Sequence, residues 1–119
     1  MEKNHLALGK QGEALAASHL IQKGYILLER NWRFKRLEID IIATKDRQLY
    51  FIEVKTRGSL NYGFPEENIL KKKMKRVRIA ATHYHYLHPL YKRIQFDVIA
   101  VCLSNETCQD LRHFEDVYG

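Results

Sequence analysis

The chain has 119 residues, of which 45% are hydrophobic and 29% are charged, a balance typical of a globular protein with one core. Its apolar runs are far shorter than the roughly 18–20 residues of a membrane span, and its first residues lack the apolar stretch of a secretory signal. The two cysteines, Cys102 and Cys108, are too few to staple a domain of this size. We therefore expect one domain, residues 1–119, in the cytoplasm and away from membranes, with reduced thiols.

The net charge is +6 and the isoelectric point is near 9.4. Such a balance bears on solubility and partners rather than on fold. Nucleic acid is the partner class that it favours, and a mildly basic protein without such a partner is the alternative.

The N-terminal half predicts one helix followed by three strands. Residues 6–23 are rich in Ala and Leu and end at Gly24, as expected of a helix with a glycine stop. The strands are predicted at residues 25–34, 37–44 and 49–56.

The C-terminal half predicts a second helix and further strands. A loop at residues 57–65 leads to a helix that starts at Pro65 and stops before Pro89. The strands are predicted at residues 94–103 and, as a short edge strand, 112–118. The order α-β-β-β-α-β, with this extra edge strand, predicts an α/β fold in which helices flank a central mixed sheet.

The second helix has one apolar stripe and a basic remainder. The stripe consists of Leu70, Met74, Val77, Ala81 and Tyr84. Six of the eight residues from 71 to 78 are Lys or Arg. Two interpretations are open: a solvated helix face, or a surface that follows the phosphates of a nucleic acid.

Charged residues interrupt the most strand-like stretch, LEIDIIATKDRQLYFIEVKTR. If the turn is centred on residues 46–47, Asp40 faces Glu53 and Glu38 faces Lys55 across an antiparallel pair. Apolar residues then face each other on both sides of the hairpin, and a slip of one residue would separate the carboxylates. The Asp-Arg pair is not a favoured two-residue turn, and a four-residue turn would keep the same register.

Opposed carboxylates repel each other unless a positive charge lies between them. Oxygen ligands from Asp40 and Glu53 would suit Mg²⁺, which binds through one or two carboxylates together with substrate phosphates. Lys55 lies on the same face and could position the attacking water or stabilise charge on the phosphate. The alternative is an ion-pair cluster in which Lys55 and nearby arginines neutralise the acids.

The first helix contributes one more acid. Leu6, Glu13 and Leu20 are seven residues apart and share a face, so Glu13 interrupts an apolar stripe. It either points toward the sheet or is a boundary glutamate that reaches solvent.

Several motifs occur in an order that resembles a known family. They are GKQGEALAASHLIQKGY, RNWR, LEIDIIA, FIEVKTR, GFPEENILKKKMKR and FDVIAV, spread over about residues 9–102. Together they resemble the YraN-like family of small bacterial predicted endonucleases of the PD-(D/E)xK type. That family is related to archaeal Holliday-junction resolvases and has a restriction-endonuclease-like fold.

The resemblance implies roles for individual residues. Asp40, Glu53 and Lys55 match the core metal and catalytic positions, Glu13 completes the acidic site, and the carbonyl of Val54 is an additional metal ligand. The residues expected to contact nucleic acid, from the resemblance and from the basic helix, are Thr56, Arg57, Lys71, Lys72, Lys73, Lys75 and Arg76. Leu37 departs from the family, which commonly has glycine there, and bears on the fit of the nucleic-acid backbone.

The sequence thus predicts a Mg²⁺- or Mn²⁺-dependent endonuclease acting on DNA, with branched or damaged DNA as candidate substrates. The alternative is a nuclease-like module that binds nucleic acid without cutting it. A homodimer is left open, because the resolvase relatives act as dimers.

Overall fold

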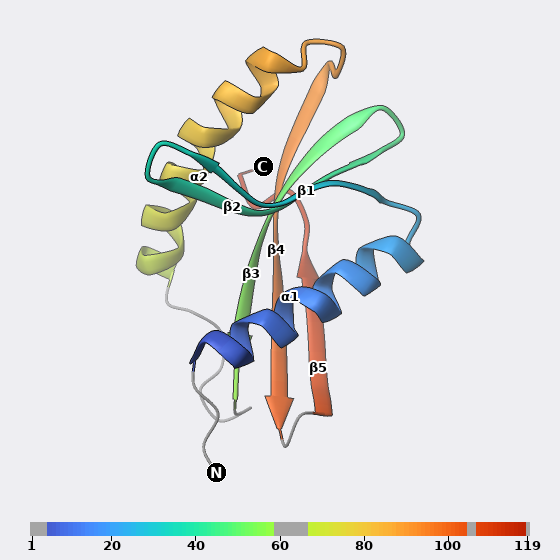
Figure 1. Cartoon of the computed structure of the whole chain (residues 1–119), viewed down its shortest axis with the longest axis vertical. Coiled ribbons are helices and arrows are strands. Elements are labelled where there is room, and N and C mark those ends of the chain that lie inside the picture. The colour runs from blue at the N-terminus through green and yellow to red at the C-terminus, as the bar shows by residue number, and fades with distance from the viewer. Residues whose placement is uncertain (1–4, 59–66, 105–106, 119) are drawn as a thin grey trace.

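The computed structural model describes residues 5–58, 67–104 and 107–118 (Figure 1). The elements are α1 (His5–Gln22), β1 (Ile26–Phe34), β2 (Leu37–Lys45), β3 (Gln48–Arg57), α2 (Glu67–Leu87), β4 (Arg93–Ser104) and β5 (Thr107–Phe114). The predicted order and fold class are confirmed, and the arrangement is consistent with a restriction-endonuclease-like core. The predicted helix start at Pro65 and most of the loop at 57–65 lie outside the described residues.

The five strands form one sheet in the order β1-β2-β3-β4-β5. Neighbouring strands are antiparallel except β3 and β4, which are parallel because α2 carries the chain back between them. Figure 1 shows α1 lying across β3, β4 and β5 at the front, with α2 beside the other end of the sheet.

The hairpin of β2 and β3 has the predicted register. Its pairs run from Lys45 with Gln48 to Ile41 with Ile52, around a two-residue turn at residues 46–47. Both turn residues have positive φ, 52° and 65°, as a type I′ hairpin requires. The alternation of apolar residues therefore determined the register although the turn pair is not a favoured one.

The sheet divides beyond the last pair of this hairpin. The β2–β3 pairing stops at Ile41 and Ile52, whereas β2 continues to pair with β1 as far as Leu37, and β3 continues to pair with β4 as far as Arg57. In Figure 1, β1 and β2 accordingly cross β3 and β4 at a steep angle. We call this point of separation the fork, and Asp40 and Glu53 lie directly beyond the last pair there.

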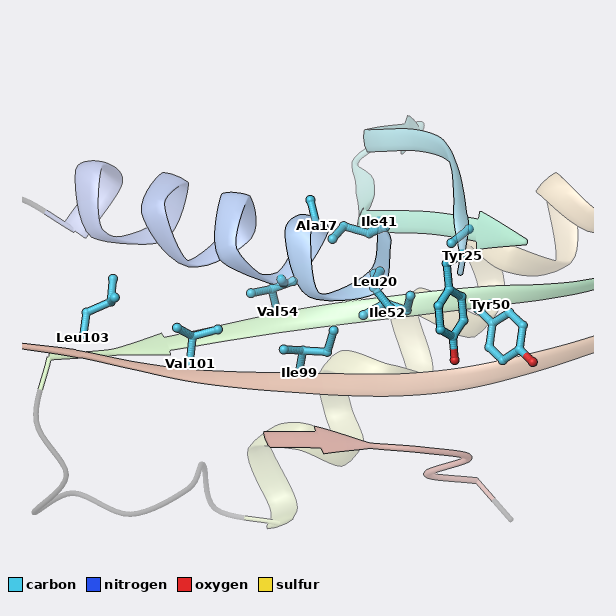
Figure 2. Packing of buried hydrophobic residues seen from close by; sticks show 12 residues of the cluster. Ala17, Leu20, Tyr25, Ile41, Tyr50, Ile52, Val54, Ile99, Val101 and Leu103 are labelled. Atoms are coloured by element: carbon cyan, nitrogen blue, oxygen red, sulfur yellow. The ribbon is translucent and has the colours of Figure 1, made fainter. Parts of the chain in front are cut away.

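Each face of the sheet has its own core. On one face, buried side chains of α1 pack against β3 and β4, as Figure 2 shows for Leu20, Ile52, Val54, Ile99 and Val101. On the other face, α2 packs its predicted stripe against Phe51 and Phe96. That stripe is confirmed for Met74, Val77, Ala81 and Tyr84, and the side chain of Leu70 lies outside the described ones.

Glycine at position 12 lets α1 approach β3 closely. A Cβ atom on Gly12 would lie 1.8 Å from the Thr56 hydroxyl oxygen, far inside van der Waals contact. The helix backbone therefore contacts Thr56, and this contact places the next residue, Glu13, near the fork.

The last strand lies earlier in the chain than predicted. β5 spans Thr107–Phe114 instead of residues 112–118, because its pairing with β4 begins at Ser104 with Thr107. Its polar, largely exposed pattern gave little signal of a strand. Among the residues described, no helix is long and apolar enough to cross a membrane.

Candidate functional site

The backbone of β3 holds the carboxylate of Asp40 at the fork. Asp40 Oδ2 accepts a hydrogen bond of 2.8 Å from the backbone N–H of Val54. Val54 follows the last paired residue of β3 by two positions, so this bond spans the gap where the two strands separate. The bond fixes Asp40 beside Glu53, as the predicted register required.

Glu53 is completely buried, with 0% of its surface exposed. Its Oε1 forms an ion pair with the ammonium group of Lys73 from α2. Its Oε2 is enclosed and has no hydrogen-bond partner among the described residues. Burial and, after it, the negative charge of Asp40 raise the pKa of Glu53 to about 8, although Lys73 opposes both effects.

Lys55 lies beside the same carboxylate, as predicted. Its Nζ is 3.9 Å from Glu53 Oε1, and less than a quarter of its side chain is exposed. Burial lowers the pKa of Lys55, and the nearby ammonium of Lys73 lowers it further, while Glu53 opposes the shift. The ammonium group therefore faces the fork rather than bulk water.

Glu13 joins the acidic group from α1. It is half-buried, and burial followed by the charge of Asp40 raises its pKa. With its amide nitrogen turned toward the acids, Asn31 donates to Glu13 Oε1 at 2.8 Å and to Glu38 Oε1 at 2.9 Å. Glu13 thus lies at the boundary of the core, half-buried, with its carboxylate beside the other acids of the fork.

The predicted pairing of Glu38 with Lys55 is wrong. Glu38 instead pairs with Arg33 of β1, at 3.3 Å between the carboxylate and the guanidinium. The physical reason is the fork: β2 and β3 have already separated at this level, so residues with the right register sum no longer face each other.

Sequence reasoning missed two residues of the site. Lys73 was predicted only as a phosphate contact, although it lies one helical turn before Val77 on the buried side of α2, and that spacing could have placed it against the sheet. Asn31 has a φ of 52° within β1, a left-handed conformation that asparagine tolerates better than most residues. No pattern in the sequence signals that local turn of the backbone.

The predicted nucleic-acid-binding residues fall into two groups. Exposed positions along α2 hold Lys71, Lys72, Lys75 and Arg76. Thr56 lies under α1 on the opposite face of β3, and Arg57 is half-buried with its Nε enclosed and unpartnered among the residues described. The structure thus gathers the basic residues of α2 but does not bring Thr56 to them.

A second cluster, which sequence reasoning did not identify, could also hold a metal ion. Ligand atoms of Asp97, His113 and Glu115 all lie within 4.8 Å of one another. Asp97 is completely buried, and His113 Nε2 lies 2.8 Å from its Oδ2. Its Oδ1 accepts 2.9 Å hydrogen bonds from the Gln95 amide and from the backbone N–H of Asp116. Both oxygens of Asp97 are therefore already satisfied by the protein.

Comparison with known proteins identifies relatives along nearly the whole chain. The model of the uncharacterised protein family UPF0102 matches residues 12–101. A UPF0102 protein of Flavobacterium psychrophilum is 40% identical over 96% of this chain and 95% of its own length. Relatives from Chlorobium limicola and Rhodococcus opacus are 44% and 36% identical and are covered over 96% and 98% of their lengths. The YraN-like resemblance is thereby confirmed, and the chain belongs to the uncharacterised protein family UPF0102.

Proposed function

We propose that this protein is a Mg²⁺- or Mn²⁺-dependent endonuclease that hydrolyses phosphodiester bonds in DNA. One observation carries the proposal: the completely buried Glu53 has an oxygen that receives no N–H donor from the described part of the chain, beside the fixed carboxylate of Asp40. Buried polar groups are normally paired, so such an oxygen calls for a ligand from outside the chain.

The residues at the fork fit a hard divalent cation. The carboxyl groups of Asp40 and Glu53 lie side by side, and the charge of Asp40 raises the cost of ionising Glu53. With the backbone carbonyl of Val54, they would supply the few oxygen ligands that Mg²⁺ takes from a protein. When bound, the ion would polarise the scissile phosphate and lower the pKa of the attacking water.

The protein's own groups would then orient the reaction. The Val54 N–H holds Asp40 in one position, which avoids reorganisation during the reaction. The ammonium group of Lys55 would orient the water or stabilise charge on the phosphate oxygens. Glu13, held by Asn31, would bind a water molecule at the edge of the site.

DNA is the proposed substrate because of the charge around the site. The exposed side of α2 is dominated by lysine and arginine, and Lys73 brings this basic helix directly to Glu53. Basic surfaces of this kind bind the phosphate backbone with an affinity that falls steeply as salt increases. Branched and damaged DNA are the substrates to test first.

The experiment is a cleavage assay on supercoiled plasmid, linear duplex, single-stranded DNA and a four-way junction, each with Mg²⁺, Mn²⁺ or EDTA. Asp40→Asn and Lys55→Ala should abolish cleavage while DNA binding persists. Lys92→Ala, an exposed lysine next to β4, is the matched control and should cut like the wild type. All variants are purified identically, and equal cleavage by Asp40→Asn and wild type would refute the proposal.

A non-catalytic nucleic-acid-binding module is the second candidate. The ion pair between Lys73 and Glu53 favours it, because the buried acid then has a counter-charge without a metal ion. Calorimetry with Mn²⁺ separates the two candidates. The endonuclease should bind Mn²⁺ in a manner that Asp40→Asn removes, whereas the module should bind DNA, show no such site and cut none of the substrates.

A further inference from the structure

A groove runs between the turn that joins β1 to β2 and the helix α2. Its volume is about 610 Å³, and among the described residues that line it, five of nine are Lys or Arg and one is an acid. One wall is the turn, with Arg36 and Leu37. The other wall is a stripe of α2.

The spacing along α2 explains this second wall. Lys72, Lys75, Arg76 and Ile79 occupy positions i, i+3, i+4 and i+7 and therefore share one face of the helix. All four are exposed, and Ile79 keeps 57% of its surface in contact with solvent. The large aliphatic side chain of Ile79 is thus exposed to solvent among lysine and arginine side chains.

Packing holds the two walls in place relative to each other. The next residue of the same stripe, His83, stacks on Phe34 of β1 with ring centroids 4.0 Å apart and an angle of 15° between the rings. Phe34 pairs with Leu37 and closes the turn that carries Arg36. The groove is therefore joined at this end by contacts between folded elements.

The groove also borders the acidic fork. Lys73 lines the groove and pairs with Glu53. Glu38 lines it as well and accepts a hydrogen bond from Asn31, which also binds Glu13. A chain lying in the groove would thus contact residues that directly neighbour the carboxylates of the fork.

The groove combines cationic side chains with the apolar side chains of Leu37, Val77 and Ile79. A duplex presents phosphates to such a surface but keeps the faces of its bases stacked inside. A single strand can place its phosphates against the cationic side chains and its base faces against the apolar side chains.

We propose that this groove binds a single-stranded segment of DNA and leads it to the site at the fork. The inference rests on the proposed function and specifies its substrate: the strand to be cut is unpaired where it enters, as in a flap, gap or branch. Two residues that the sequence analysis did not identify would contact this single strand: Arg36 its phosphates and Ile79 its bases.

The test measures binding in EDTA, so that no cleavage is required. A labelled oligothymidylate of about 15 nucleotides and a hairpin duplex of equal charge are titrated by fluorescence anisotropy at several salt concentrations. We expect the single strand to bind at least about 5-fold more tightly than the duplex.

Two variants test the two features of the groove. Ile79→Gln should weaken single-strand binding about 3- to 10-fold and leave duplex binding unchanged, because unpaired bases contact the apolar side chains and the stacked bases of a duplex do not. Its matched control is Ile21→Gln, an isoleucine of α1 that is exposed to a similar extent, 59%. Arg36→Ala should weaken single-strand binding and lower its salt slope by about one, whereas Arg93→Ala, at the far end of the sheet, should not.

Tighter binding of the duplex, or an Ile79→Gln variant that binds the single strand like the wild type, would overturn the inference. Failure of the proposed function gives a different result. If no DNA is cut with Mg²⁺ or Mn²⁺ but the single strand is preferred, the groove proposal is supported and the proposed nuclease activity is refuted. If DNA is cut but the duplex is preferred, the proposed nuclease activity is supported and the groove proposal is refuted.

Discussion

Two completely buried acids lie on neighbouring strands of the sheet, and their surroundings are opposite. Asp97 of β4 has a donor for each oxygen, from Gln95, Asp116 and His113. Glu53 of β3 has an ion pair at one oxygen and, among the described residues, no hydrogen-bond partner at the other. Burial alone therefore does not distinguish a structural acid from a functional one; the supply of donors does.

The difference follows from where each acid lies in the sheet. Asp97 pairs with Ile52 of β3 and lies one residue before the β4–β5 pairing begins at Val98. The chain after β5 returns to this point, with the Val117 N–H donating to Phe96 O at 2.8 Å. Glu53 lies at the fork, where β2 has left β3 and the Val54 N–H is taken by Asp40. Asp97 binds the C-terminal segment, whereas Glu53 has an oxygen that receives no N–H donor from the described residues.

The largest expected effect concerns cleavage. Glu53→Gln should lower the rate of metal-dependent DNA cleavage about 1000-fold or more, because the amide is a poor ligand for a hard cation. Asp97→Asn, measured at a temperature at which it is folded, should keep its rate within about 5-fold of the wild type, since its side chain lies away from the fork. Rates are measured on the best substrate of the panel. Equal losses in both variants would remove the functional distinction between the two acids.

The order should reverse for stability. Asp97→Asn should lower the free energy of unfolding by about 2–4 kcal/mol, because the amide nitrogen would face a donor in a buried network. Glu53→Gln should change it by less than about 1 kcal/mol or increase it, since the amide has a similar shape and replaces an acid whose ionised form is disfavoured by burial. Urea unfolding followed by circular dichroism measures both values. A Glu53→Gln variant as unstable as Asp97→Asn would contradict the comparison.

The pH dependence of stability should reveal Glu53. Its pKa is about 8 in the folded protein against an ordinary value of 4.5, so the folded state keeps a proton that the unfolded chain has released. Stability therefore falls as the pH rises through this window, and the loss is complete above the folded pKa. Relative to Glu53→Gln, the wild type should lose on the order of 2 kcal/mol between about pH 5 and pH 8. Parallel curves for the two proteins would be inconsistent with a raised pKa.

Saturating Mn²⁺ provides the control for this pH experiment. At a pH near 8 it should restore stability to the wild type by binding the ionised carboxylates, and it should leave Glu53→Gln nearly unchanged.

The smallest effect tests how α1 reaches the fork. Gly12→Ala should lower the free energy of unfolding by about 1–2 kcal/mol, because its Cβ would overlap Thr56 and push the helix away from β3. Gly9→Ala is the matched control on the same helix; no atom lies within 4 Å of its Cβ, and it should stabilise by up to about 1 kcal/mol. The same displacement should move Glu13 and weaken cleavage modestly, without disturbing the donors around Asp97. Equal unfolding curves for the two alanine variants would contradict the close approach.

Much of the site could be predicted because it lies within one hairpin. The apolar alternation determined the register of β2 against β3, whose pairs end at Ile41 and Ile52. The next residues, Asp40 and Glu53, stay close because Asp40 accepts a hydrogen bond from the Val54 N–H across the fork. The error over Glu38 and Lys55 came from extending that register past the point where the strands separate. A separation of this kind depends on the twist of the whole sheet and leaves no mark on the pairing pattern of two strands.

By itself, the sequence determined the order of elements, the two apolar faces and the local grouping of acids, since each depends on periodicity along a short stretch of chain. Only the tertiary structure decided which charged groups meet across the fold. Lys73 reaches Glu53 because α2 packs on that face, and Asp116 reaches Asp97 because the C-terminal segment folds back over β4. Whether a buried acid is satisfied or left open depends on such distant donors, which side-chain spacing along one segment does not specify.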